Sequence, residues 1–256
     1  LLYKSFKTMS VLASGAVVRQ VLLSAGAEES QIMAKLQPIA TDMHALGNPW
    51  ISYSVYLNNS FLPGLLQLMI LLVTVFSIGS EMKRATSREW LRTADDSIII
   101  AITGKLIPQT IIFFSMGLLY LSLLYGYLHF PMHNSIWHMI FAMFLLVVAS
   151  QSFAVIIMCF APSLRIGLSV GGLVGVLSLS IAGFSFPVPA MYLPFQAISY
   201  VLPVRHYFLI YVDQALNGIP LYYSRVHYVA LILFAVASTP LLPRLKKALM
   251  RQVYVP

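Results

Sequence analysis

Five long apolar stretches constrain what this chain can fold into. They cover residues 61–80, a length within 97–127, 136–160, 164–186 and 223–242. Each is close to the roughly 20 residues that a helix needs to cross the hydrocarbon core of a bilayer. Charged residues make up only 9% of the chain, against about 25% in soluble domains. The stretches are continuous rather than alternating, which argues against a transmembrane barrel. The sequence therefore predicts an all-α polytopic helical membrane protein with five spanning helices.

The Lys and Arg residues between these stretches predict the orientation. They are concentrated in the first loop, in a short loop after the third helix and after the fifth helix: Lys83, Arg84, Arg88 and Arg92; Arg165; Arg244, Lys246, Lys247 and Arg251. The segment 129–135 has none. Because positive loops face the cytoplasm, we expect these loops and the C-terminus to be cytoplasmic. The net charge of +8 is explained by topology, so no nucleic-acid partner is expected.

This orientation places residues 1–60 outside the membrane. We expect residues 1–27 to form an extracytoplasmic helix rather than a span, since Arg19 interrupts their modest apolar run. An odd number of spans with an external N-terminus predicts a further, first helix upstream of Leu1. The expected organisation is the C-terminal remnant of an extracytoplasmic domain over 1–60 and a transmembrane domain over 61–256.

Motifs for several kinds of catalysis are missing from the sequence. There is no G-x-x-x-x-G-K-[ST] phosphate loop, no G-x-S-x-G nucleophile elbow and no H-E-x-x-H zinc pair. His129, His133 and His138 cluster around one outer loop, but Pro131 prevents a shared helical face for the first two. We therefore expect interfacial histidines, no metal site and no catalytic residues. Cys159 lies in an apolar run and is expected to be a buried small hydrophobe.

The charged loop after the first span is the main candidate functional element. We expect Ser87 to cap a short helix in it, with Glu89 near the positive end. We expect Trp90 to be exposed beside Leu91. An exposed pair of this kind favours a docking element for a cytoplasmic partner over a solvated connector. The candidate residues are Glu81, Lys83, Arg84, Thr86, Arg88, Glu89, Trp90 and Leu91.

Two further motifs lie within the spans. Gly104, Lys105 and Pro108 stand near the start of the second span, where Pro108 predicts a kink and Lys105 is expected to snorkel toward the cytoplasm. Gly167, Gly171 and Gly175 recur at a spacing of four residues on the fourth span. Small residues at this spacing allow close helix packing, either within one chain or between two copies.

A proline-rich stretch follows the fourth span. Its candidate residues are Pro187, Met191, Pro194 and Pro203. Prolines at this density do not permit a regular spanning helix. The stretch predicts an outer re-entrant segment of short helices that enter and leave the outer leaflet, with an ordinary interfacial loop as the alternative.

The order of these elements resembles the permease subunit of type-2 ABC exporters of the bacterial multidrug type, a subclass with a large extracytoplasmic insertion. Asn48-Pro49 followed by 59–64 resembles the family's entry into its second helix. Residues 83–91 are similar to its "E-R-x-x-G-T-x-E-x-L" loop, and 104–108 to its "G-K-x-x-P" element. The stretch from Gly183 to Pro194 resembles its re-entrant segment. Ala85 stands where the family commonly has Gly, and Arg88 departs from the usual acidic spacing.

The resemblance implies a non-enzymatic transport subunit in the bacterial cytoplasmic (inner) membrane. It would pair with a second permease copy, identical or not, and with cytoplasmic ABC ATPase subunits that bind the ATP, so the chain itself needs no cofactor. The 81–91 loop would transmit motion, with Lys105 and Pro108 near the elbow. A drug or lipid-like substrate is expected, as are a periplasmic adaptor and contacts with membrane lipid. The alternatives are a membrane-embedded lipid-modifying enzyme, and an ABC-type module that performs mechanical work without transport.

Overall fold

The computed structural model describes residues 2–26, 53–184 and 186–251, and all regular structure in these ranges is helical. The chain forms two compact units, residues 1–44 and 45–256. In the first unit, α1 (Leu2–Ser24) is not among the helices that are long and apolar enough to span a membrane. The Asn48-Pro49 pair of the sequence analysis lies outside the described residues.

Within its described residues, the second unit contains five helices that are long and apolar enough to span a membrane, which confirms the predicted number. The first four are α3 (Tyr53–Lys83), α5 (Ile98–Leu121), α6 (Ile136–Phe160) and α7 (Leu164–Ile181). The fifth covers Leu221–Arg251 and begins with α10 (Leu221–Val236). A π-helical turn, Ser122–Tyr127, extends α5. The protein is therefore an all-α polytopic membrane protein.

Three predicted helix ends were wrong. The first span begins at Tyr53 rather than at residue 61. The fourth ends at Ile181 rather than at 186, because Gly183 adopts a left-handed backbone conformation with φ of 102°. The fifth regular helix ends at Val236, and a 3₁₀ turn that contains Pro240 separates it from α11 (Leu242–Arg251).

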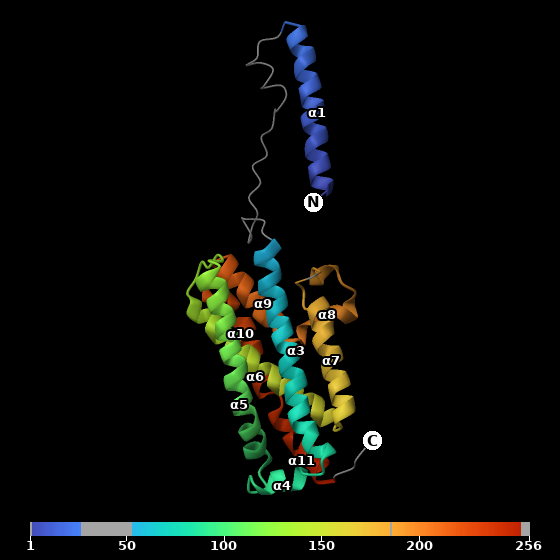
Figure 1. Cartoon of the computed structure of the whole chain (residues 1–256), viewed down its shortest axis with the longest axis vertical. Coiled ribbons are helices and arrows are strands. Elements are labelled where there is room, and N and C mark those ends of the chain that lie inside the picture. Colours follow the sequence, from blue (N-terminus) through green and yellow to red (C-terminus); the bar gives the residue numbers. More distant parts are fainter. Residues whose placement is uncertain (1, 27–52, 185, 252–256) are drawn as a thin grey trace. The chain divides into compact units, whose positions relative to one another are not determined.

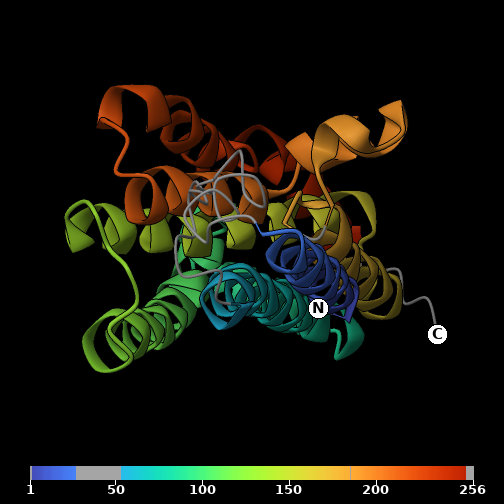
Figure 2. The ribbon, with the colours of Figure 1, turned by 90° about the horizontal axis from the view of Figure 1, so that it is seen from above.

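The central helix of the bundle is α6. Seen from above, it crosses between α3 and α5 on one side and α9 (Pro203–Tyr211) and α10 on the other (Figure 2). Its core side chains, such as Met139, Met143, Leu146 and Met158, are fully buried. The two ends of the bundle differ: α4 (Ser87–Arg92) and α11 lie at one end, and α8 (Leu193–Tyr200) and α9 lie at the other (Figure 1). We call these the α4 end and the α9 end.

Helices α3 and α7 pack closely through glycines on both helices. A Cβ atom at Gly175 would lie 3.2 Å from the Cα atom of Leu68, and one at Gly167 would lie 2.9 Å from a methyl carbon of Val75. At Gly171 the nearest atom would be 3.7 Å away, an ordinary van der Waals contact. The glycine ridge of the sequence analysis therefore packs against α3 of the same chain.

We predict that Gly175→Ala destabilises the bundle, while Gly171→Ala is nearly neutral. The Gly175 methyl would press on the backbone of α3, and overpacking of this kind costs about 1–3 kcal/mol. Denaturation of the purified protein in mixed detergent micelles measures both changes, with Gly171→Ala as the matched control. Equal effects of the two substitutions would contradict the packing described here.

Candidate functional site

A tight turn and a short helix connect α3 to α5 at the α4 end. Ala85 has φ of 59°, a left-handed conformation that favours glycine. A glycine at this position would adopt the same conformation without strain. Ser87 was predicted to cap α4, but it is the first residue of the helix, and its hydroxyl donates to the backbone carbonyl of Glu81 at 3.2 Å. The Thr86 hydroxyl donates to the Glu81 carboxylate. The C-terminal turn of α3 therefore anchors the start of α4.

An ion pair joins α3 and α5 beneath this turn. The Lys105 ammonium lies 2.6 Å from Oε1 of Glu81 and donates to the carbonyl of Ser77 at 2.8 Å. It also lies 4.4 Å from the centre of the Trp90 ring. The Lys105 and Glu81 side chains are only 20% and 23% exposed. The Lys105 side chain thus reaches the α4 end, where its ammonium is held by a carboxylate on the neighbouring span.

Trp90 and Leu91 of α4 were expected to form an exposed pair, but the structure places neither on the exposed surface. Leu91 is fully buried, and Trp90 is partly buried between the ammonium of Lys105 and the apolar core. Their aromatic and aliphatic surface stabilises the corner instead of facing solvent. The predicted loop residues that remain exposed are charged: Lys83, Arg84, Arg88 and Glu89.

The predicted elbow residues differ in their surroundings. Pro108 lies on an exposed face inside α5, and the helix continues through it. No atom lies within 4 Å of a Cβ built at Gly104, so packing does not require a glycine there. Between these two residues, the Leu106 carbonyl accepts from the Thr110 hydroxyl at 2.9 Å and from the Gln151 amide of α6 at 3.3 Å. Of the three elbow residues, only Lys105 joins the α4 corner.

We predict that Glu81→Gln and Lys105→Met are energetically coupled. Either single change leaves a partly buried charge without its partner, so the double variant should be more stable than the sum of the single effects predicts. We expect a coupling energy of about 1–2 kcal/mol in a double-mutant cycle measured by denaturation in micelles. A cycle of Lys83→Met with Lys105→Met is the control and should be additive, because Lys83 is exposed. Additivity in both cycles would contradict the pairing.

The α9 end is built from short helices that begin at prolines. A 3₁₀ turn, Val188–Ala190, starts directly after Pro187 and is followed by Met191. Pro194 and Pro203 lie in the first turns of α8 and α9. Prolines suit this position because the first amides of a helix have no partner within it. The prediction of short helices in place of a regular span is confirmed.

Helix α9 is almost entirely buried, and two polar residues missed by the sequence analysis hold it in place. Gln67 of α3 donates to the Ser178 hydroxyl of α7 at 3.0 Å and accepts from the backbone N–H of Val204 at 2.8 Å. Arg205 donates from Nη1 to the carbonyl of Ala182 at 3.1 Å and packs 4.6 Å from the Tyr200 ring centre. A lone Gln in an apolar helix was the available signal for the first of these residues.

We predict that Gln67→Leu destabilises the bundle by about 1–3 kcal/mol, the cost of a buried polar group left without its partner. The change would leave the Val204 N–H without an acceptor. Asn58→Leu on the same helix is the control, because the Asn58 amide bonds within its own helix, to Ser54 one turn earlier. Denaturation in micelles checks both variants, and a neutral Gln67→Leu would contradict the role of Gln67 at α9.

The three loop histidines do not form a joint site. His129 is exposed and its Nδ1 lies 2.9 Å from the carbonyl of Tyr127, whereas Nδ1 of His133 faces the carbonyl of Ala215. Within the described residues, no group of three or more His, Cys, Asp or Glu could hold a metal ion. His206 is buried in α9, with Nε2 at 3.0 Å from the Tyr200 carbonyl, and burial lowers its pKa below the ordinary value.

An apolar groove of about 250 Å³ lies between α3 and α5. It is lined by side chains such as Leu62, Met69, Phe113 and Met116, and the only hydroxyl among its lining residues belongs to Tyr120. This hydroxyl donates to the carbonyl of Asn58 at 3.2 Å. The surface of the groove is therefore almost wholly hydrocarbon.

Comparison with known proteins identifies the family. The sequence model of a family described as ABC-2 family transporter protein matches residues 1–242. No match was found among curated proteins or among solved structures. The match covers most of the chain. The chain belongs to the ABC-2 family of transporter proteins, the membrane components that work with an ABC ATPase.

Proposed function

We propose that this chain is the permease subunit of an ATP-driven exporter, and that α4 receives the motion of a separate ATPase subunit. In this arrangement the α4 end and the C-terminus face the cytoplasm, and the α9 end faces outward, in agreement with the distribution of Lys and Arg. The membrane is the bacterial cytoplasmic membrane. The ATP is bound by the partner subunit, so the permease itself carries no cofactor.

The observation that carries this proposal is the corner formed by α3, α4 and α5. Helix α4 lies at the end of the bundle and is joined through short connections to two spans. Its anchor, Glu81, is ion-paired with Lys105 of the second of these spans. A force applied to α4 is therefore passed to α3 and α5 together instead of being absorbed by a flexible loop.

We propose an amphiphilic or hydrophobic substrate, such as a drug or a lipid-like molecule. The apolar groove between α3 and α5 supports this choice, since it offers hydrocarbon contacts and little polar surface. None of the residues that line the groove is charged, and the ion pair of Lys105 with Glu81 lies near the α4 end. The proposed assembly contains a second permease copy, surrounding lipid and a periplasmic adaptor.

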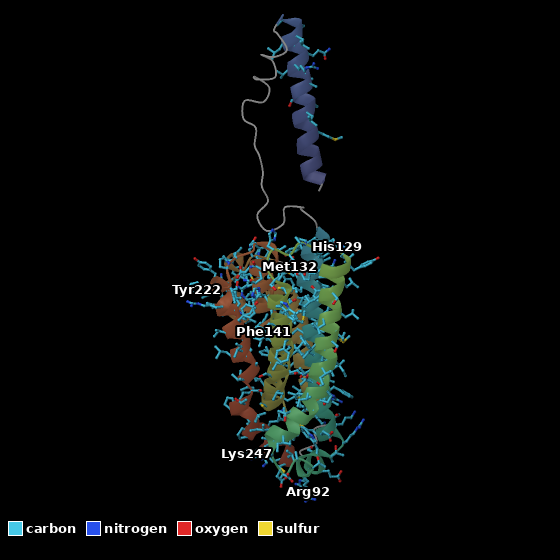
Figure 3. All side chains as sticks on the ribbon, turned by 90° about the vertical axis from the view of Figure 1, so that its left-hand side faces the viewer. Arg92, His129, Met132, Phe141, Tyr222 and Lys247 are labelled. Carbon is cyan, nitrogen blue, oxygen red and sulfur yellow. The ribbon has the colours of Figure 1, made fainter. Side chains whose placement is uncertain are left out.

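The test combines co-purification with site-specific crosslinking. The full chain is purified in mild detergent with a photo-crosslinking benzoylphenylalanine in place of Glu89, which is exposed on α4. We expect an ATP-hydrolysing subunit to co-purify and to crosslink at this position. The same replacement at Tyr222, exposed at the opposite end (Figure 3), is the control and should give no such crosslink. Purification of the chain without any ATPase would contradict the proposal.

A further inference from the structure

The C-terminal helix α11 has one apolar and one cationic face. Leu242, Leu245 and Leu249 are buried on the first face. On the other face the exposed side chains include Arg244, Lys247 and Arg251. The sequence analysis treated these cations only as topological signals at a chain end. In the structure they belong to a folded helix at the α4 end.

Helix α11 is attached to α4 and to the turn after it. The Arg88 guanidinium donates from Nε and Nη2 to the carbonyl of Met250, at 3.3 and 3.2 Å. The Lys246 ammonium donates to the carbonyl of Asp96 at 2.6 Å. The buried leucines of α11 and Leu91 of α4 belong to one hydrophobic cluster. Apolar packing and polar bonds thus join the two helices into a single surface, which we call the α4–α11 platform.

The platform is strongly cationic. Its exposed basic side chains come from both parts: Lys83, Arg84, Arg88 and Arg92 from the α3–α5 connection, and Arg244, Lys247 and Arg251 from α11. Its exposed acidic side chains, Glu89, Asp95 and Asp96, all lie in the connection. The exposed charged side chains of α11 are therefore all basic. In the α3–α5 connection, by contrast, acidic side chains offset part of the positive charge.

Two features favour a protein partner over the lipid surface. An amphipathic helix that binds a membrane buries its apolar face among the lipids, but the apolar face of α11 is already covered by protein. In addition, Lys247 and Arg92 lie at the same end of the bundle (Figure 3), the end at which a soluble subunit docks in the proposed assembly. A cationic surface in this place fits an acidic partner surface, which speeds encounter and sets specificity.

We infer that α11 forms the second half of the ATPase-docking surface, and that its cationic face binds an acidic surface on the ATPase subunit. The inference rests on the proposed function. It adds a second contact with the ATPase subunit, made by α11, to the contact that α4 makes. It also gives the α11 cations a binding role besides their role in topology.

The test reverses charge on α11 and measures binding of the ATPase subunit that co-purifies with the wild type. Lys247→Glu combined with Arg251→Glu should lower the affinity at least about tenfold and reduce its dependence on salt. Arg165→Glu, an exposed cation at the start of α7, is the matched control and should retain wild-type affinity. A photo-crosslinker in place of Lys247 should crosslink the same ATPase subunit as one in place of Glu89.

The outcomes separate this inference from the proposed function. If Glu89 crosslinks the ATPase while the double charge reversal binds it as tightly as the wild type, α11 is no docking element and only the inference falls. If neither position crosslinks an ATPase, both fall. If the reversal leaves ATPase affinity intact but abolishes thermal stabilisation by phosphatidylglycerol vesicles relative to phosphatidylcholine vesicles, the face binds lipid headgroups and the inference is overturned.

Discussion

Polar groups inside an apolar bundle are costly unless they find partners within the protein, and the pairs that they form constrain how the helices pack. Hydrocarbon offers no hydrogen bonds, so each unpaired group there costs several kcal/mol. Such pairs include Gln67 with Ser178, Thr74 with Gln109, Thr110 with Gln151, and Ser152 with Ser238 of the turn after α10. Because a hydrogen bond tolerates little displacement, these pairs fix the registers of α3, α5, α6 and α7 that nonspecific apolar packing would leave free.

The architecture could be predicted from the sequence where a single chemical requirement dominates. Long apolar stretches have to become spanning helices, and five were found. Several prolines close together do not permit a regular spanning helix, which is why the segment around Pro194 and Pro203 consists of short helices. The ridge at Gly167 and Gly175 correctly indicated close packing, but only the structure identifies α3 as the helix that meets it.

Side-chain orientation at the α4 corner could not be predicted, because it depends on contacts between residues far apart in the chain. A Lys near the end of a span usually reaches toward water, yet Lys105 finds Glu81 on the neighbouring span. That pairing makes the apolar face of Trp90 a cation-binding surface and removes it from solvent. Helix α11 was missed for the same reason, because its three buried leucines contact residues far away in the chain. In the sequence these leucines stand one turn apart among basic residues, which dominate the composition of the segment.

Helix α3 connects the α4 end and the α9 end of the bundle. Glu81, at its C-terminal end, holds the α4 corner, and Gln67 holds the first turn of α9. These residues lie 14 positions apart, which corresponds to about 21 Å along a helix. Between them, the side of α3 that faces α7 is packed against glycines, so it has little space in which to slide alone. A displacement of the α4 corner must therefore carry α7 and the start of α9 with it, or break contacts that the bundle has no water to replace.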